Sequence, residues 1–158
     1  VFFLILSFLI IIPVTFIRLF AAIGSPSPIA DNWRTHIEPY LKDPTLYPLL
    51  QTIIYATYFT PYYIYITSYL TTSLLSSSPI TPSHTLLDWT SLHLGASLQA
   101  QFSFVGPSLH NIPTYPEPTW RPVPEEGWVY FVVTHTLLTV VPILVWVRLM
   151  TSRKVKGE

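Results

Sequence analysis

Residues 83–105 read SHTLLDWTSLHLGASLQAQFSFV, a segment long enough to cross a bilayer that nevertheless carries many polar side chains. As a helix of about 3.6 residues per turn, it would have two polar stripes separated by leucine and alanine. A charged residue at mid-membrane costs about 2.5–3.5 kcal/mol on insertion scales, so Asp88 and its neighbours are expected to face other helices or a hydrated cavity. The segment is therefore predicted to be the central helix of a bundle. One stripe contains His84, Asp88, Ser91, Gly95 and Gln99, and the opposite stripe contains Thr90, His93, Ser97 and Gln101.

The composition of the 158-residue chain is typical of an integral membrane protein. Half of its residues are hydrophobic and 10% are charged, whereas about a quarter of the residues of a soluble domain are charged. Eight basic and eight acidic residues leave no net charge that would favour nucleic acid. The chain has no cysteine, which excludes disulfides, thiolate catalysis and cysteine-ligated metals.

Apolar segments at four places predict an all-α polytopic membrane protein, in which residues 1–158 form a single transmembrane domain, a four-helix bundle. Prolines inside the first, second and fourth segments predict kinked spans, and Arg18, near the end of the first, is expected to reach the headgroups. The basic tail predicts a cytosolic C-terminus, and an even number of spans places the N-terminus there too. Because the sequence starts at Val1 rather than methionine, a preceding segment is expected to be missing. The predicted spans are residues 1–23, 49–75, 83–105 and 128–150.

Tyrosines recur at helical spacing along the second predicted span. Tyr55, Tyr58, Tyr62, Tyr65 and Tyr69 follow one another at intervals of three or four residues, so they share one helix face. Such a stripe is typical of helix packing with hydroxyls bonded across a bundle. It would also suit the aromatic wall of a pocket for a flat, mostly apolar ligand.

Asp88 is the carboxylate that the predicted spans place within the membrane, and His84 precedes it by one helical turn. Moving a sterol double bond requires an acid and a base, so this pair could be catalytic. A structural hydrogen-bonding network and a ligand-recognition role remain open for the same pair. No second pair of histidines or carboxylates occurs at helical spacing, so neither a metal site nor a cofactor is predicted. The GxSxG and HExxH motifs and glycine-rich phosphate loops are absent from the sequence.

Three short motifs resemble the emopamil-binding-protein-like (EXPERA) family, most closely its sigma-two-receptor branch. They are Ile12–Phe16 (IPVTF), Tyr40–Leu46 (YLKDPTL) and residues 134–148 (THTLLTVVPILVWVR). The resemblance implies a four-helix fold in the endoplasmic reticulum membrane and homodimerisation. It also implies an intramembrane pocket for sterols or other amphipathic lipids, which Asp43 would support from the lumenal end.

The resemblance is incomplete at the acids that the family carries in its first two spans. Their positions fall near Arg18 and Tyr55 in this chain, and neither acid is present. This difference argues against sterol isomerisation and against recognition of cationic ligands.

Together these observations predict a non-enzymatic sterol- or lipid-binding protein of the endoplasmic reticulum membrane that takes part in sterol handling and lipid transport. One alternative is a sterol double-bond isomerase that uses Asp88 and His84. Another is an accessory subunit of a larger membrane complex, with the central helix packed against a partner. Expected partners are a sterol or other amphipathic lipid, the membrane, and a second copy or another membrane protein, but not nucleic acid. The residues expected to line the ligand pocket are Asp43, Tyr55, Tyr58, Tyr62, His84, Asp88, Gln99 and His135.

The end of the sequence carries a lysine pattern that is typical of retrieval to the endoplasmic reticulum. Lys154 and Lys156 are the fifth and third residues counted from the end of the sequence, in the pattern of di-lysine retrieval signals. Positive charge retained on the cytosolic side explains the same lysines equally well.

Overall fold

The computed structural model describes residues 1–43, 45–76, 80–109 and 123–154, and every regular element within these ranges is a helix. The prediction of an all-α chain is therefore confirmed. The long helical segments coincide with the predicted spans to within a few residues. They are α1 (Phe2–Ala22), then α3 (Tyr47–Ile54), the π-helix η3 (Tyr55–Phe59) and α4 (Thr60–Leu75) in continuous succession, then α5 (His84–Leu109) and α6 (Glu125–Lys154). Short helices between α1 and α3 are α2 (Pro28–Asn32), the π-helix η1 (Trp33–Ile37) and the 3₁₀-helix η2 (Pro39–Lys42).

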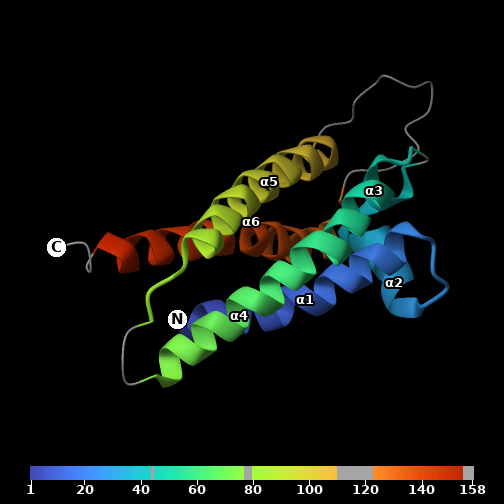
Figure 1. Ribbon diagram of the computed structural model, residues 1–158. Coiled ribbons are helices and arrows are strands. Elements are labelled where there is room, and N and C mark those ends of the chain that lie inside the picture. The colour runs from blue at the N-terminus through green and yellow to red at the C-terminus, as the bar shows by residue number, and fades with distance from the viewer. Residues whose placement is uncertain (44, 77–79, 110–122, 155–158) are drawn as a thin grey trace.

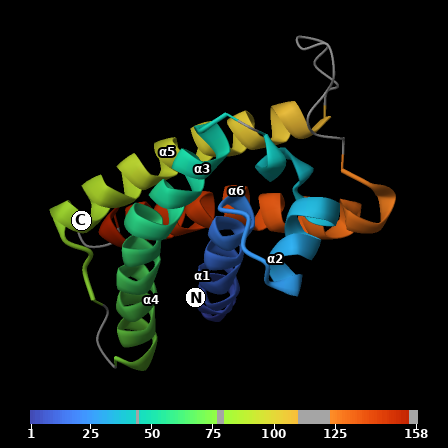
Figure 2. The same cartoon turned by 90° about the vertical axis from the view of Figure 1, so that its right-hand side faces the viewer.

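The long helices are arranged as antiparallel neighbours (Figure 1). α1 lies beside α4, α5 lies beside α6, and α1 also contacts α6. In Figure 2, α1 and α4 run across the direction of α5 and α6, so the two pairs cross rather than stand parallel. The start of α1 and the end of α6 lie toward the same side of Figure 1, together with the end of α4 and the start of α5.

The prolines act differently in the three helical segments that contain them. The helical path continues through Pro13 in α1 and through Pro142 in α6. In the second segment, η3 ends two residues before Pro61, and the wider turn of a π-helix accommodates a residue without a backbone N–H. The Thr60 hydroxyl donates a hydrogen bond of 3.2 Å to the Tyr55 carbonyl oxygen, which satisfies an acceptor within this turn.

Two helices in the described part of the chain are long and apolar enough to cross a membrane, namely Phe2–Ala22 and Glu125–Ser152. Along α1 the side chains of Leu4, Phe8 and Ile11 are buried, while a broad apolar face is exposed. An exposed apolar surface of this extent is typical of a face that contacts lipid. The outward residues of α1 are Phe2, Phe3, Leu6, Leu9, Ile10, Phe16 and Phe20.

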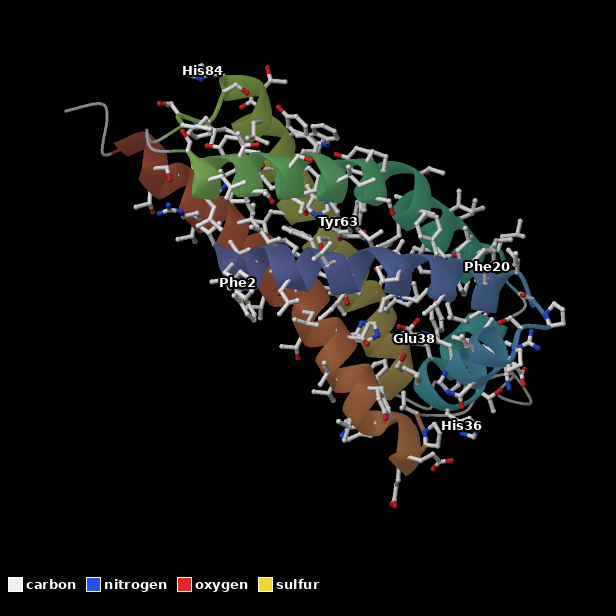
Figure 3. All side chains as sticks on the ribbon, turned by 90° about the horizontal axis from the view of Figure 1, so that it is seen from below. Phe2, Phe20, His36, Glu38, Tyr63 and His84 are labelled. Atoms are coloured by element: carbon white, nitrogen blue, oxygen red, sulfur yellow. The ribbon has the colours of Figure 1, made fainter. Side chains whose placement is uncertain are left out.

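The segment between α1 and α3 folds back onto the long helices instead of remaining at the surface. η1 contacts α1 and α6, and η2 contacts α1 and α5. The apolar side chains of Ile37, Tyr40 and Leu41 are buried, and Glu38, which lies among them in the sequence, is carried into the interior. Figure 3 shows Glu38 among the helices, whereas His36 lies at the outer end beside the start of α6.

Candidate functional site

The candidate site is centred on an ion pair between Arg18 of α1 and Glu38, which lies between η1 and η2. Arg18 Nε donates a hydrogen bond of 2.9 Å to Glu38 Oε2, and each side chain is 1% exposed. The rings of Phe104 and Tyr55 cover the guanidinium, whose central carbon lies 4.4 Å and 5.1 Å from their respective centres. Burying two charges in an apolar interior carries a large desolvation penalty, so the pair marks a candidate for function.

A chain of polar contacts extends this ion pair to the other long helices. His135 Nε2 lies 3.2 Å from Glu38 Oε1, and His135 Nδ1 lies 2.6 Å from Gln101 Oε1. Gln101 Nε2 in turn donates a hydrogen bond of 2.6 Å to the Tyr55 hydroxyl. The contacts therefore join α1, the η1–η2 junction, α6, α5 and η3. We call Arg18, Glu38, His135, Gln101 and Tyr55 the buried network.

The orientation of the Gln101 amide decides which nitrogens of His135 carry a hydrogen. The Gln101 oxygen cannot donate, so His135 Nδ1 carries the hydrogen of that contact. His135 Nε2 faces a carboxylate oxygen of Glu38, and this contact is favourable when Nε2 also carries a hydrogen. A ring with hydrogens on both nitrogens is an imidazolium. If the oxygen and nitrogen of the Gln101 amide are exchanged, the amide donates to His135 Nδ1, and the neutral His135 ring carries its hydrogen on Nε2 alone. Both arrangements present Nε2–H to Glu38, and the first makes His135 cationic.

The helical residues of the buried network lie on the inner faces of their helices. On α1, Arg18 comes one turn after the buried Thr15, and on α6, His135 lies between the buried Phe131 and Leu138. On α5, one of the two predicted polar stripes faces the other helices. Its members, Thr90, His93, Ser97 and Gln101, are between 0% and 4% exposed.

Burial and the neighbouring charges act on Glu38 in opposite directions. Burial alone would raise the pKa of its carboxyl above the ordinary value of 4.5, because an apolar environment disfavours the charged form. The Arg18 guanidinium, followed by the His135 ring, favours the carboxylate and lowers the pKa to about 2. Glu38 is therefore ionised at neutral and mildly acidic pH.

The depressed pKa of Glu38 predicts a loss of stability in acid. Its contribution is fully present above the ordinary pKa of 4.5 and is lost as the pH falls toward the folded-state pKa of about 2. The shift corresponds to a contribution on the order of 3 kcal/mol. Thermal unfolding in detergent across this pH window should show a smaller decline of the midpoint for Glu38→Gln than for the wild type. The exposed control Asp31→Asn should follow the wild type, and an identical pH response of the wild type and Glu38→Gln would contradict the prediction.

An apolar cleft borders the buried network. It lies along α6 beside the last part of α5 and has a volume of about 350 Å³, which is within the range of about 300–1,000 Å³ for small-molecule sites. The His135 ring belongs to both features, because it lines the cleft while its nitrogens contact Glu38 and Gln101. The other lining residues are Val105, Trp128, Phe131, Val132, Thr136, Thr139 and Val140.

A second buried polar cluster surrounds His93, two turns before Gln101 on α5. The His93 ring is 0% exposed and stacks on the Tyr62 ring at a centroid distance of 4.0 Å. Phe59 and Tyr63 meet it edge-on at 4.5 Å and 5.1 Å. Among the described residues, neither His93 nitrogen has a hydrogen-bond partner, and the Tyr63 hydroxyl has none either. The hydrogen-bonding capacity of this cluster is therefore largely unused.

Replacing His93 with phenylalanine should raise the free energy of unfolding by about 1–3 kcal/mol, because it removes unpaired buried nitrogens and keeps a ring against Tyr62. Unfolding in detergent measures the change. His84→Phe is the matched control, since His84 is exposed at the start of α5, and it should change stability by less than about 0.5 kcal/mol. A His93→Phe protein that is less stable than the wild type would refute the prediction.

Of the residues predicted to line a pocket, Tyr55 and His135 belong to the buried network. Tyr58 and Tyr62 lie farther along the same helical segment, where it meets α5. Trp89 Nε1 donates a hydrogen bond of 3.1 Å to the Tyr58 hydroxyl, and Tyr62 is fully buried. These two tyrosines therefore belong to the contact between the second and third long segments.

Asp43, His84, Asp88 and Gln99 lie away from the buried network. Asp43 accepts a backbone hydrogen bond in the turn before α3. His84, Asp88 and Gln99 are exposed on the outer face of α5, and Figure 3 shows His84 at one end of the molecule, well apart from Glu38 among the helices. The structure thus separates the pair considered for isomerisation from the buried acid.

Two further predictions concern metals and the C-terminal end. Among the described residues, no group of three or more histidines and carboxylates could hold a metal ion. Of the predicted retrieval signal, Lys154 is the last residue of α6, and Lys156 lies outside the described residues.

Sequence reasoning missed Arg18 and Glu38 as site residues. The sequence predicts that Arg18 reaches the headgroups, but the structure buries it, because it shares the inner face of α1 with Ser7 and Thr15. The helical spacing of Arg18 from these two polar residues could have indicated that it faces the interior. For Glu38, the signal is its place directly after Ile37 in an apolar stretch that returns to the interior.

The helical fold, the apolar helices and the buried network define an all-α membrane protein. Comparison with curated proteins shows similarity to proteins named Transmembrane 6 superfamily member 2. The rat protein (Rattus norvegicus) is 37% identical over 111 residues, 70% of this chain and 26% of the relative. The mouse (Mus musculus) and human (Homo sapiens) proteins are 37% and 35% identical over 105 residues, 66% of this chain and 25% of each relative. The chain thus spans about a quarter of the length of these relatives, and no protein-family model or solved structure matches it.

These relatives overturn the resemblance to the EXPERA family and its sigma-two-receptor branch. They match about two thirds of the chain and carry a different name, whereas the resemblance rested on three short motifs. Such motifs are weak guides because apolar residues and proline are frequent in membrane helices generally. The transmembrane name of the relatives agrees with the two apolar helices and supports a membrane protein.

Proposed function

We propose that this chain is a membrane-embedded binding protein for an amphipathic lipid, such as a sterol or a single-chain lipid, which it holds without chemical change. The observation that carries the proposal is the His135 ring, which lines an apolar cleft and contacts the buried ion pair on its other side. Small-molecule sites are mostly apolar, with a few polar groups that fix the orientation of the ligand. An amphipathic lipid likewise has an apolar body, which would lie in the cleft, and a polar head, which would face the ion pair.

The proposal includes a multi-pass topology with four spans and both termini in the cytosol. The placement of the start of α1 and the end of α6 toward the same side supports an even number of crossings. Arg148, Arg153 and Lys154 near the end of α6 support a cytosolic C-terminus by the positive-inside rule.

The cleft provides the test. Photoactivatable sterol and photoactivatable fatty acid would each be incorporated with the purified protein into nanodiscs, and cross-linked peptides would be mapped by mass spectrometry. We expect labels on α5 and α6 around Val105 and Val140, and a several-fold loss of labelling in Val140→Trp, which fills the cleft. Val133→Trp is the matched control, because Val133 is exposed on α6 outside the cleft. Equal labelling of both variants, or labels spread over all lipid-facing helices, would reject the proposal.

A further inference from the structure

The guanidinium of Arg18 has unused hydrogen-bond donors in a fully buried position. A guanidinium carries N–H groups on Nε, Nη1 and Nη2. Only the Nε–H has a partner among the described residues, whereas Nη1 and Nη2 are buried without one. Because the rings of Phe104 and Tyr55 cover its face, the unused donors lie along the edge of the planar group. Buried N–H groups left unpaired are destabilising, so this edge is suited to an acceptor that the chain itself does not supply.

The charges around this edge favour an anionic acceptor. Arg18 and His135 can both carry a positive charge, and Glu38 is the acid that faces them, while the remaining members of the buried network, Gln101 and Tyr55, are neutral. A cationic head would instead lie against the Arg18 guanidinium, which is unfavourable in a low-dielectric interior.

A ligand head can reach this edge from the cleft if the His135 side chain turns aside. His135 separates the cleft from the ion pair, and its Nε2 lies 3.2 Å from Glu38 Oε1. Although this separation is that of an ion pair, neither atom makes a hydrogen bond of acceptable geometry. Turning the His135 side chain therefore opens the path by breaking its contact of 2.6 Å with Gln101, while no hydrogen bond to Glu38 is lost.

We propose that the site binds the carboxylate of a long-chain fatty acid, with its two oxygens on the Nη1 and Nη2 edge of Arg18 and its acyl chain in the cleft between α5 and α6. A planar carboxylate matches a guanidinium edge with two parallel hydrogen bonds, whereas a sterol hydroxyl offers one oxygen and an alkylammonium offers no acceptor. This inference rests on the proposed lipid-binding function and names the class of its ligand.

The test compares ligands that share a chain and differ in the head. Binding of palmitate, hexadecanol and hexadecylamine to the purified full chain in nanodiscs would be measured by competition with radiolabelled palmitate and, separately, by direct binding of each labelled compound. We expect palmitate to bind about ten-fold or more tightly than hexadecanol, and the amine most weakly. Lysophosphatidate of the same chain length distinguishes a phosphate head, and its tighter binding would overturn the assignment to a carboxylate.

Variants at Arg18 separate this inference from the proposed function. Arg18→Met should remove the preference for palmitate and retain hexadecanol binding. Arg34→Met, at a half-buried arginine paired with Asp31 outside the buried network, should leave both unchanged. If Arg18→Met does not fold, Arg18→Lys keeps the charge, loses the planar fork and should lower the preference several-fold. Equal affinity for the three heads, or an unchanged preference in a folded Arg18 variant, overturns the carboxylate site alone. Binding of none of these lipids, nor of a sterol, overturns the proposed function as well.

Discussion

Replacing Glu38 with alanine is expected to lower the free energy of unfolding by about 3–5 kcal/mol, because it leaves the buried Arg18 cation without its partner. An unpaired guanidinium at 1% exposure would draw water into the interior or force α1 to rotate toward the surface. The double substitution Arg18→Met with Glu38→Leu should recover most of this loss, since apolar residues of similar size often replace a buried ion pair without penalty. Glu38→Ala alone should therefore be less stable than the double variant.

A double-mutant cycle measures this coupling. Arg18→Met, Glu38→Leu and the combined variant would be unfolded with SDS in mixed micelles, with helix content followed by circular dichroism. The coupling between the two sites should exceed about 2 kcal/mol, within the range for residues of one network. The exposed pair of Asp31 and Arg34 is the matched control, and its coupling should lie below about 1 kcal/mol. Additive losses at Arg18 and Glu38 would mean that the two charges do not meet in the folded protein.

The apolar helices could be predicted from the sequence because their signal is local. The run from Phe2 to Ala22 is continuous enough that length and hydropathy alone mark a helix that can cross a membrane. The π-helix η3 could not be predicted in this way, because its wider turn depends on how Pro61 and Thr60 settle against the neighbouring helices. The burial of the segment after α1 could not be predicted from the sequence either, since its return to the interior depends on contacts with α6.

The candidate site shows a different limit of sequence reasoning. A helical wheel gives α5 two polar stripes but does not say which one faces inward, and the structure places Gln101 inside and Asp88 outside. The sequence is equally ambiguous for Arg18, because a single cation near a helix end suits the headgroup region as well as a buried partner. Its partner, Glu38, is 20 residues away in the sequence. Such a pairing is a property of the tertiary fold, and no local spacing rule identifies it.

The polar outer stripe of α5 needs an explanation that the apolar face of α1 does not. Asp88 and Gln99 are exposed on α5, whereas the outward side chains of α1 include large apolar residues throughout its length. Polar side chains at membrane depth are normally sheltered by protein or water. The accessory-subunit alternative therefore remains a testable hypothesis for this stripe, and cross-linking from Gln99 would identify whichever chain covers it.

Replacing Gly127 with alanine is expected to be the other severely destabilising change, with a loss of about 3 kcal/mol or more. Gly127 lies in the first turn of α6, against the backbone of His36 in η1. A Cβ atom at this position would lie 1.5 Å from the His36 carbonyl oxygen and 2.5 Å from its carbonyl carbon. Because both atoms belong to the backbone, no side-chain rotation relieves the clash, and η1 must move away from α6.

The movement of η1 would extend to the candidate site, which makes the prediction specific. Glu38 directly follows η1 and approaches His135 of α6 to 3.2 Å, so separating η1 from α6 should also weaken ligand binding at the buried network. Gly95→Ala is the matched control, because a Cβ there meets nothing within 4 Å, and alanine should stabilise the helix by up to about 1 kcal/mol. Unfolding of both variants in detergent measures the difference. If Gly127→Ala were as stable as Gly95→Ala, η1 could not be packed against α6, and Glu38 would lose the contact that carries it to His135.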